Sequence, residues 1–254
     1  MLLFCFWRLQ KNYAEKIIRK FFTICAVFHD FSYENLEYLN SCAIYKNYKK
    51  DEIVLSYGTK AKYFNVIVSG WLKIFRTTPD GHELIIDLYS KGNCFSKTSS
   101  LKENSIYHYD VSTIEPTTIM KIPAIKIREL LKKNNHLALS VIEMLSSHIA
   151  ELELQLEHQV VMNAKQKVGC FLMRLALEDQ NGKKVISLPT NKTLIALKLG
   201  MQRETFSRTL EQLSKTGLKV KGRNVTIDNI ESLRKHTCIN CSKAGACKIF
   251  KNSN

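Results

Sequence analysis

The chain has 254 residues, of which 45% are hydrophobic and 24% are charged, so it is long enough to bury a core and too hydrophobic for a disordered or fibrous protein. It carries 38 Lys and Arg against 23 Asp and Glu, which gives a formal net charge of +15. Residues 161–254 hold 18 basic and 6 acidic residues, so most of the excess positive charge belongs to the C-terminal third. Such clustering favours a polyanionic partner, nucleic acid above all, although a solvated basic face has the same composition.

The N-terminal stretch 1–20 has its apolar run before its first charge, which is the reverse of a secretory signal. No run approaches the roughly 18 apolar residues of a membrane span. The eight cysteines form no framework typical of a small secreted domain. We therefore expect an N-terminal extension over 1–20, a cytoplasmic location and no membrane partner.

Residues 21–130 are expected to form an antiparallel β-domain. Short runs rich in β-branched and aromatic residues follow one another between 44 and 122, with glycines at 58, 70, 81 and 92 between them. This spacing of turn residues is typical of a sandwich or barrel with about eight short strands. The sequence Thr78-Pro79-Asp80-Gly81 indicates a hairpin turn, because Pro presets one turn position and Gly accepts a positive φ.

A long helix is expected over 131–163, because no Gly or Pro occurs from 136 to 163. Apolar residues recur along it at spacings of three and four, namely Ile142, Leu145, Ile149, Leu152 and Leu156. Within one chain such a stripe would be ordinary core. A helix about 40 Å long outreaches a small domain, so we expect the stripe to form a homodimer interface.

Residues 164–235 carry the pattern of a helix-turn-helix domain. Thr190 can cap a first helix, Gly200 makes a tight turn, and a second helix begins at Gln202 or Thr205. Phe206, Leu210 and Leu213 would face the first helix. Two small packed helices also occur in folds that do not bind DNA, so the spacing alone leaves that alternative open.

The opposite face of the second helix presents residues suited to base edges, which are Arg203, Glu204, Ser207 and Arg208. Arg matches the two acceptors of guanine, Glu accepts from cytosine N4, and Ser can contact several bases. Residues 217–227 alternate like a two-stranded wing with Lys221-Gly222 at its turn. We expect contacts to DNA phosphates from Thr190, Lys192, Gln202, Lys219, Lys221 and Arg223.

This layout resembles the CRP/FNR family of bacterial transcription regulators, and the motif "RETFSR" at 203–208 is its closest local match. The resemblance implies an α+β fold: an antiparallel β-roll (jelly-roll-like) sensor domain, a long dimerisation helix and a C-terminal winged helix-turn-helix. It implies a homodimer that reads a two-fold-symmetric site in double-stranded DNA and acts on RNA polymerase. The alternative is a ligand-binding signalling module whose small helical domain does not read DNA. An enzyme is not expected, because the sequence carries no phosphate loop, G-x-S-x-G elbow or H-E-x-x-H helix.

The resemblance also bears on the ligand of the sensor domain. Members that bind cyclic nucleotides carry Gly-Glu and Arg-Ser motifs, and this chain has Ser96-Lys97 and Tyr107-His108 at those positions. An ammonium replaces the carboxylate for the ribose, and a phenol replaces the guanidinium for the phosphate. The sequence therefore argues against cyclic AMP.

The tail, residues 236–254, holds Cys238, Cys241 and Cys247 in the pattern C-x2-C-x5-C. Some FNR-like regulators hold a [4Fe–4S] cluster with a similar C-terminal motif, so the resemblance implies a cluster here. Zinc with His236 as a fourth ligand is the second alternative, and a tail without a metal is the third. The N-terminal cysteines Cys5, Cys25 and Cys42 are too widely spaced to indicate a cluster.

Overall fold

The computed structural model describes residues 28, 30–178, 185–188, 192–228 and 233–237. It divides the chain into two compact units, Met1–Ser146 and Ser147–Asn254. Within the described residues, no helix is long and apolar enough to cross a membrane. The expected N-terminal extension, residues 1–20, lies outside the described part.

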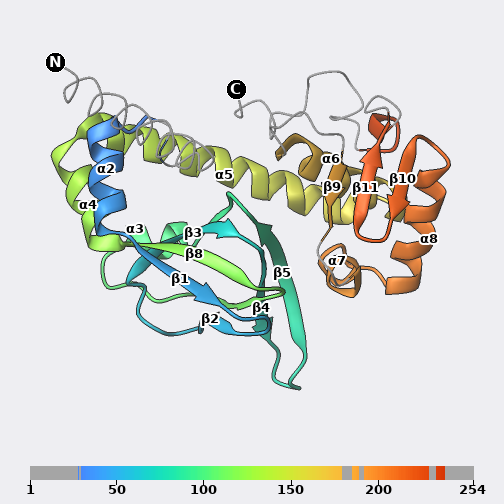
Figure 1. Cartoon of the computed structure of the whole chain (residues 1–254), viewed down its shortest axis with the longest axis horizontal. Helices are drawn as coiled ribbons and strands as arrows, with labels where there is room; N and C mark the ends of the chain where they lie inside the picture. Colours follow the sequence, from blue (N-terminus) through green and yellow to red (C-terminus); the bar gives the residue numbers. More distant parts are fainter. Residues whose placement is uncertain (1–27, 29, 179–184, 189–191, 229–232, 238–254) are drawn as a thin grey trace, which may run out of the picture. The chain divides into compact units, whose positions relative to one another are not determined.

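Among its described residues, the first unit contains eight strands, in agreement with the number expected from the sequence. They are β1 (Ile44–Tyr48), β2 (Ile53–Leu55), β3 (Tyr63–Ser69), β4 (Trp71–Thr77), β5 (Glu83–Ser90), β6 (Cys94–Phe95), β7 (Asp110–Thr113) and β8 (Thr117–Pro123). They form two four-stranded antiparallel sheets with the orders β1-β8-β3-β6 and β2-β7-β4-β5. The predicted antiparallel β-roll is confirmed (Figure 1).

Two apolar clusters hold the roll together. Ile67 and Ile119 of the first sheet pack with Leu72 and Ile74 of the second in a cluster that belongs to both sheets. Phe64 and Met120 belong to a second cluster, which packs against helices α2 (Tyr33–Cys42), α4 (Ala124–Lys133) and the start of α5 (Asn135–Val161). Burial of these side chains, at about 1.5–3 kcal/mol each, is the main stabilising term of this unit.

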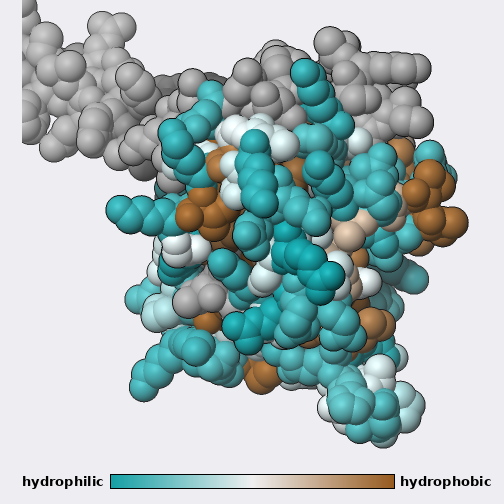
Figure 2. Space-filling view, turned by 90° about the vertical axis from the view of Figure 1, so that its right-hand side faces the viewer, coloured by the Kyte–Doolittle hydropathy of each residue, from teal (hydrophilic) through white to brown (hydrophobic). Residues whose placement is uncertain are grey.

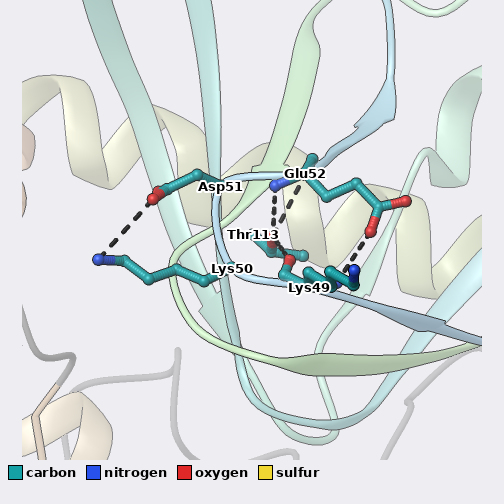
Figure 3. A network of polar contacts seen from close by, with 5 residues as sticks. All are labelled: Lys49, Lys50, Asp51, Glu52 and Thr113. Atoms are coloured by element: carbon teal, nitrogen blue, oxygen red, sulfur yellow. Dashed lines mark hydrogen bonds and ion pairs between the residues drawn. The ribbon is translucent and has the colours of Figure 1, made fainter.

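Turns of the roll form where the sequence predicts them. The hairpin between β4 and β5 closes at Thr78–Gly81, where the Gly81 N–H donates to the Thr78 carbonyl at 2.9 Å and Gly81 has φ 84°. Gly70 has φ 92°, and an added Cβ would lie 2.6 Å from the Pro116 carbonyl oxygen. At the β1–β2 turn, the Glu52 N–H donates to the Thr113 hydroxyl at 3.0 Å, which ties this turn to β7 (Figure 3).

The predicted long helix is divided at Asn134. Its backbone leaves the helical region (φ −138°, ψ 101°), and its side-chain Oδ1 accepts the N–H groups of His136 and Leu137 at 3.0 and 3.3 Å. Such side-chain capping starts a new helix. Helix α5 therefore begins at Asn135 and not at 131, and α4 precedes it as a separate element.

The second unit contains α6 (Ala164–Glu178), β9 (Val185–Ser187), α7 (Lys192–Lys198), α8 (Arg203–Ser214), β10 (Leu218–Lys221) and β11 (Asn224–Ile227). Its three strands form an antiparallel sheet with the order β10-β11-β9. Helix α6 starts with a reciprocal pair, in which the Gln166 N–H donates to Asn163 Oδ1 and the Asn163 N–H donates to Gln166 Oε1. This capping box satisfies two backbone donors at the helix start.

Candidate nucleic-acid interface

Helices α7 and α8 are joined by the tight turn that the sequence predicts at Gly200. The Gly200 N–H donates to the Leu197 carbonyl at 3.1 Å, and the Met201 N–H donates to the Ala196 carbonyl at 3.0 Å. These two bonds form a Schellman motif, which requires a left-handed residue, and Gly200 has φ 65°. The glycine at position 200 therefore ends α7 and allows the tight turn that leads to α8.

Helix α8 has one buried face and one exposed face. Phe206, Leu210 and Leu213 are at most 3% exposed, which confirms them as the inward residues. The four residues predicted to contact bases, Arg203, Glu204, Ser207 and Arg208, are all exposed. Because they lie on one helix within six positions, they form a continuous polar face.

The start of α8 is also open to a ligand. Gln202 is the N-cap residue, its side chain makes no capping bond, and it is exposed. The first N–H groups of a helix lack partners within the helix and favour anions. This end of α8 is therefore suited to a phosphate group.

Strands β10 and β11 form the predicted wing. Leu218 pairs with Ile227, and Lys221 pairs with Asn224, so the turn is Gly222-Arg223 and not Lys221-Gly222. Gly222 has φ 63°, a value that glycine adopts without strain. Lys221 is therefore the last residue of β10 and not a turn residue.

The predicted phosphate-contacting residues differ in their surroundings. Lys221 is exposed, whereas Lys219 forms an ion pair with Asp228 at 3.0 Å. Arg223 donates from Nε to the Leu188 carbonyl at 3.1 Å, which ties the wing to the end of β9. Lys192 begins α7 and is half-buried, and Thr190 lies outside the described residues.

The surface of this unit is strongly basic. Residues 192–228 contain eight Lys and Arg residues against three Asp and Glu residues. Figure 2 looks onto the side where Figure 1 places α8 and β10, and hydrophilic side chains cover most of the visible face. A basic, hydrophilic face around an exposed helix is suited to the phosphates and base edges of DNA.

In the first unit, Ser96, which stands at the position expected for a cyclic nucleotide, is held by hydrogen bonds within the chain. Ser96 has φ 60°, and its N–H donates to the Tyr109 hydroxyl at 2.7 Å. The Ser96 hydroxyl donates to the Tyr63 carbonyl at 3.2 Å and accepts from Asn65 Nδ2 at 2.9 Å. Burial raises the pKa of Tyr107 and raises that of Tyr109 to about 12, so both phenols are neutral donors and acceptors.

These residues differ from the motifs that bind a cyclic nucleotide in the family. Ser96-Lys97 and Tyr107-His108 provide no guanidinium, and the backbone N–H of Ser96 is already bonded to Tyr109. Tyr109 was not among the residues predicted from the sequence. In the sequence, Tyr109 stands two residues after Tyr107, and this position does not indicate a hydrogen bond to Ser96.

Most of the predicted dimer stripe on α5 is exposed. Ile142 and Ile149 are each 57% exposed, Leu152 is 45% exposed and Leu156 is 69% exposed. Leu145 differs, because it is half-buried and packs against the core of the first unit. One predicted interface residue thus contributes to the fold of its own chain.

The tail cysteines Cys238, Cys241 and Cys247 lie outside the described residues. Among the residues that are described, no group of three or more His, Cys, Asp or Glu side chains could hold a metal ion. The described segment 233–237, which includes the first two residues of the tail, is packed against the second unit, since Leu233 and Thr237 are buried. At Gly169 of α6, an added Cβ would lie 2.2 Å from the His236 carbonyl oxygen, so this segment packs directly on α6.

Comparisons with known proteins agree with this architecture. The family model of the cyclic nucleotide-binding domain matches residues 45–134, and that of the Crp-like helix-turn-helix domain matches residues 166–236. The chain is 26% identical over 194 residues to the fumarate and nitrate reduction regulatory protein of Yersinia pestis, covering 74% of this chain and 76% of that protein. It is 23% identical over 186 residues to the anaerobic regulatory protein of Bacillus subtilis, covering 72% and 78%.

Two solved structures share the fold. A Ruegeria pomeroyi protein named for cyclic nucleotide binding is 26% identical and matches with a TM-score of 0.68, covering 87% of this chain and 97% of that one. FixK2 from Bradyrhizobium japonicum is 21% identical and matches with a TM-score of 0.69, covering 77% and 98%. With a β-roll, a helix-turn-helix and these relatives in place, the chain belongs to the CRP/FNR family of DNA-binding transcription regulators.

Proposed function

We propose that the protein is a homodimer that binds a two-fold-symmetric DNA site through α8 and acts on RNA polymerase. The observation that carries this proposal is the face of α8 formed by Arg203, Glu204, Ser207 and Arg208, which is exposed while the opposite face is buried. A recognition helix meets base edges through such a face. In a symmetric dimer, two copies of α8 would lie about one helical turn of DNA apart, roughly 34 Å.

Phosphate contacts fix the register of such a helix on DNA. The proposed contacts run from the residues before and at the start of α7 to the wing and are Thr190, Lys192, Gln202, Lys219, Lys221 and Arg223. Lys221 is the clearest of them, because it is exposed at the end of β10 beside the Gly222-Arg223 turn. To contact a phosphate, Lys219 must break its ion pair with Asp228. This costs little free energy, because an exposed ion pair contributes little to stability.

The exposed stripe on α5 supports the dimer. Four apolar side chains, from Ile142 to Leu156, recur at helical spacing and are 45–69% exposed. A continuous apolar stripe on a long helix is typical of a two-stranded coiled coil. The expected partner is α5 of a second copy of the chain, because its apolar residues have the same spacing and can pack against this stripe.

We further propose that the tail holds a redox-sensitive metal group through Cys238, Cys241 and Cys247. Support comes from the C-x2-C-x5-C spacing and from two relatives named for anaerobic or fumarate and nitrate regulation. A [4Fe–4S] cluster would make the regulator responsive to oxygen or redox state, whereas zinc would make the tail a structural clip.

The experiment separates base contacts from phosphate contacts. An operator is first selected from random DNA, and the affinities of the Arg208→Ala and Lys221→Ala variants are then measured on operator and random DNA. We expect Arg208→Ala to lose about 1–3 kcal/mol on the operator and to relax selectivity at one base pair. Lys221→Ala should weaken both DNAs by a similar factor and lower the salt dependence of binding.

A matched control is Lys60→Ala, which removes an exposed lysine of the roll. This variant should bind operator and random DNA like the parent protein. Equal losses on both DNAs for Arg208→Ala and Lys221→Ala would contradict the proposed division of roles. An affinity for DNA that does not depend on salt would favour the signalling module without DNA recognition.

A further inference from the structure

Two lysines meet on one face of the sheet β1-β8-β3-β6. Ile44 pairs with Lys121 and Lys46 pairs with Ile119, so Lys46 and Lys121 are diagonal neighbours on the same face of the antiparallel pair β1–β8. Lys121 Nζ donates to the Tyr48 hydroxyl at 3.3 Å and lies 4.8 Å from the centre of the Tyr63 ring. Lys46 Nζ lies 4.5 Å from the centre of the Tyr48 ring. The aromatic rings hold both ammonium groups in place.

This pair of cations has no counter-ion within the described residues. Lys121 is half-buried, and burial followed by the charge of Lys46 lowers its pKa. The charge of Glu52 contributes to the raised pKa of Tyr48, but the Glu52 carboxylate accepts the Lys49 N–H at 2.8 Å (Figure 3) and forms no ion pair with Lys46 or Lys121 among the described residues. Lys121 is half-buried beside the exposed Lys46, and a half-buried charge next to a like charge is costly; the cost falls when an anion binds between them.

The groups of this cluster are suited to donate hydrogen bonds. Each ammonium carries three N–H donors, and the Tyr48 hydroxyl, which accepts from Lys121, keeps its own proton to donate. Burial, with the charge of Glu52 as a second cause, raises the pKa of Tyr48 to about 12, so this proton is present at neutral pH. Donors without matching acceptors are what an oxyanion requires.

We propose that Lys46, Lys121 and the Tyr48 hydroxyl form a site for a small oxyanion, either a phosphate group or a carboxylate. The site uses residues of β1 and β8, whereas the cyclic-nucleotide motifs of the family stand at Ser96-Lys97 and Tyr107-His108. Tyr48 and Tyr107 belong to one apolar cluster, so the site lies near that position and is built from other residues. It requires neither DNA nor a metal. It therefore goes beyond the proposed function, and its test does not depend on that function.

The test measures thermal unfolding of the full chain in sodium phosphate, sodium succinate and sodium chloride at equal ionic strength. The proteins are the parent, Lys46→Gln, Lys121→Gln and the control Lys60→Gln, which removes an exposed lysine of the same roll. The basic DNA-binding face also attracts anions, but it is identical in all four proteins, so differences between them report on the roll.

We expect phosphate or succinate to raise the Tm of the parent and of Lys60→Gln above the value in chloride. For Lys46→Gln and Lys121→Gln, the apparent affinity for the anion should fall at least about tenfold, as expected for a charge-assisted hydrogen bond. An effect of phosphate alone would identify a phosphate site, and an effect of succinate a carboxylate site. If Lys121→Gln unfolds during purification, Lys46→Gln still tests the site, because Lys46 is exposed. NMR signals of the Lys121 ammonium group in the parent, which should shift when the anion binds, give a second measurement.

Equal effects of the anions on all four proteins would overturn the proposal, because they would report only the general positive charge. The absence of any anion effect on the parent would overturn it as well. That outcome would point to an acidic protein surface as the partner of the two lysines.

Discussion

The hydroxyl of Tyr109 has a specific structural task, which is to accept the backbone N–H of Ser96 at 2.7 Å. Ser96 has a positive φ, which is uncommon for a residue with a side chain, so this corner depends on its hydrogen bonds. Replacement of Tyr109 by Phe removes the acceptor and leaves a buried N–H unsatisfied. We expect a loss of about 1–3 kcal/mol in the free energy of unfolding, measured by urea denaturation.

A matched control is Tyr57→Phe, because Tyr57 is 49% exposed and its ring stacks with Arg76. This change keeps the ring and should alter stability by less than about 0.5 kcal/mol. Equal stability of the two variants would show that the Ser96 N–H finds another acceptor.

The same phenols predict alkaline behaviour. Burial raises the pKa of Tyr48 and of Tyr109 to about 12, above the ordinary value of 10.0. Between these values the folded state binds more protons than the unfolded state, so stability is fully present below pH 10 and falls as the pH rises toward 12. Absorbance at 295 nm should show a late phenolate step that becomes smaller in Tyr109→Phe. A single step near pH 10 in the folded protein would contradict this expectation.

The buried residues of α8 are predictable from the sequence, whereas contacts between strands of the roll are not. Phe206, Leu210 and Leu213 were identified as buried from their spacing alone, because one helix decides which residues share a face. The meeting of Lys46 and Lys121 was not foreseeable in that way. It depends on which strands are neighbours, and β1 and β8 are separated by about 70 residues in the sequence.

At the scale of elements, two residues of the apolar stripe on α5 differ in their surroundings. Leu145 packs against the core of the first unit, whereas Leu156 is 69% exposed. We expect Leu156→Glu to disrupt the dimer while the protomer stays folded. A fully buried Leu contributes about 1.5–3 kcal/mol, and two copies are lost, so the dissociation constant should rise at least about tenfold.

Sedimentation velocity across a range of concentrations measures this change. The control is Glu153→Gln, an exposed polar residue of the same helix that should leave the dimer intact. Leu145→Glu should instead lower the free energy of unfolding, because it places a charge against an apolar core. A monomeric parent protein would refute the assignment of the stripe as a dimer interface.

The division between α4 and α5 shows what periodicity misses. The apolar pattern is compatible with one helix from 131 onward, but the side chain of Asn134 caps a new helix and ends the previous one. Asn competes with the helix for backbone hydrogen bonds, and whether it ends a helix depends on local geometry.

At the scale of the whole molecule, the metal group proposed for the tail predicts a response to oxygen. Protein purified without oxygen should contain iron and sulfide and absorb in the visible range, and the triple variant Cys238→Ser, Cys241→Ser and Cys247→Ser should lose both. Exposure to air should reduce operator affinity in the parent and leave the variant unchanged. Zinc in the parent would identify a structural clip, and no metal in either protein would refute the metal proposal.

The sequence by itself determined the strand-rich segment, the long helix and the helix-turn-helix that follows it, the turns at glycine, the inward face of α8 and the family to which the chain belongs. These features depend on local periodicity and on residue types with strong backbone preferences. Only the tertiary structure decided that Leu145 packs against the core of its own chain and that the Tyr109 hydroxyl accepts the Ser96 N–H. It also decided that Lys46 and Lys121 lie on one face of the sheet. Those contacts join residues distant in the sequence, and they are set by sheet order and packing, which no local pattern specifies.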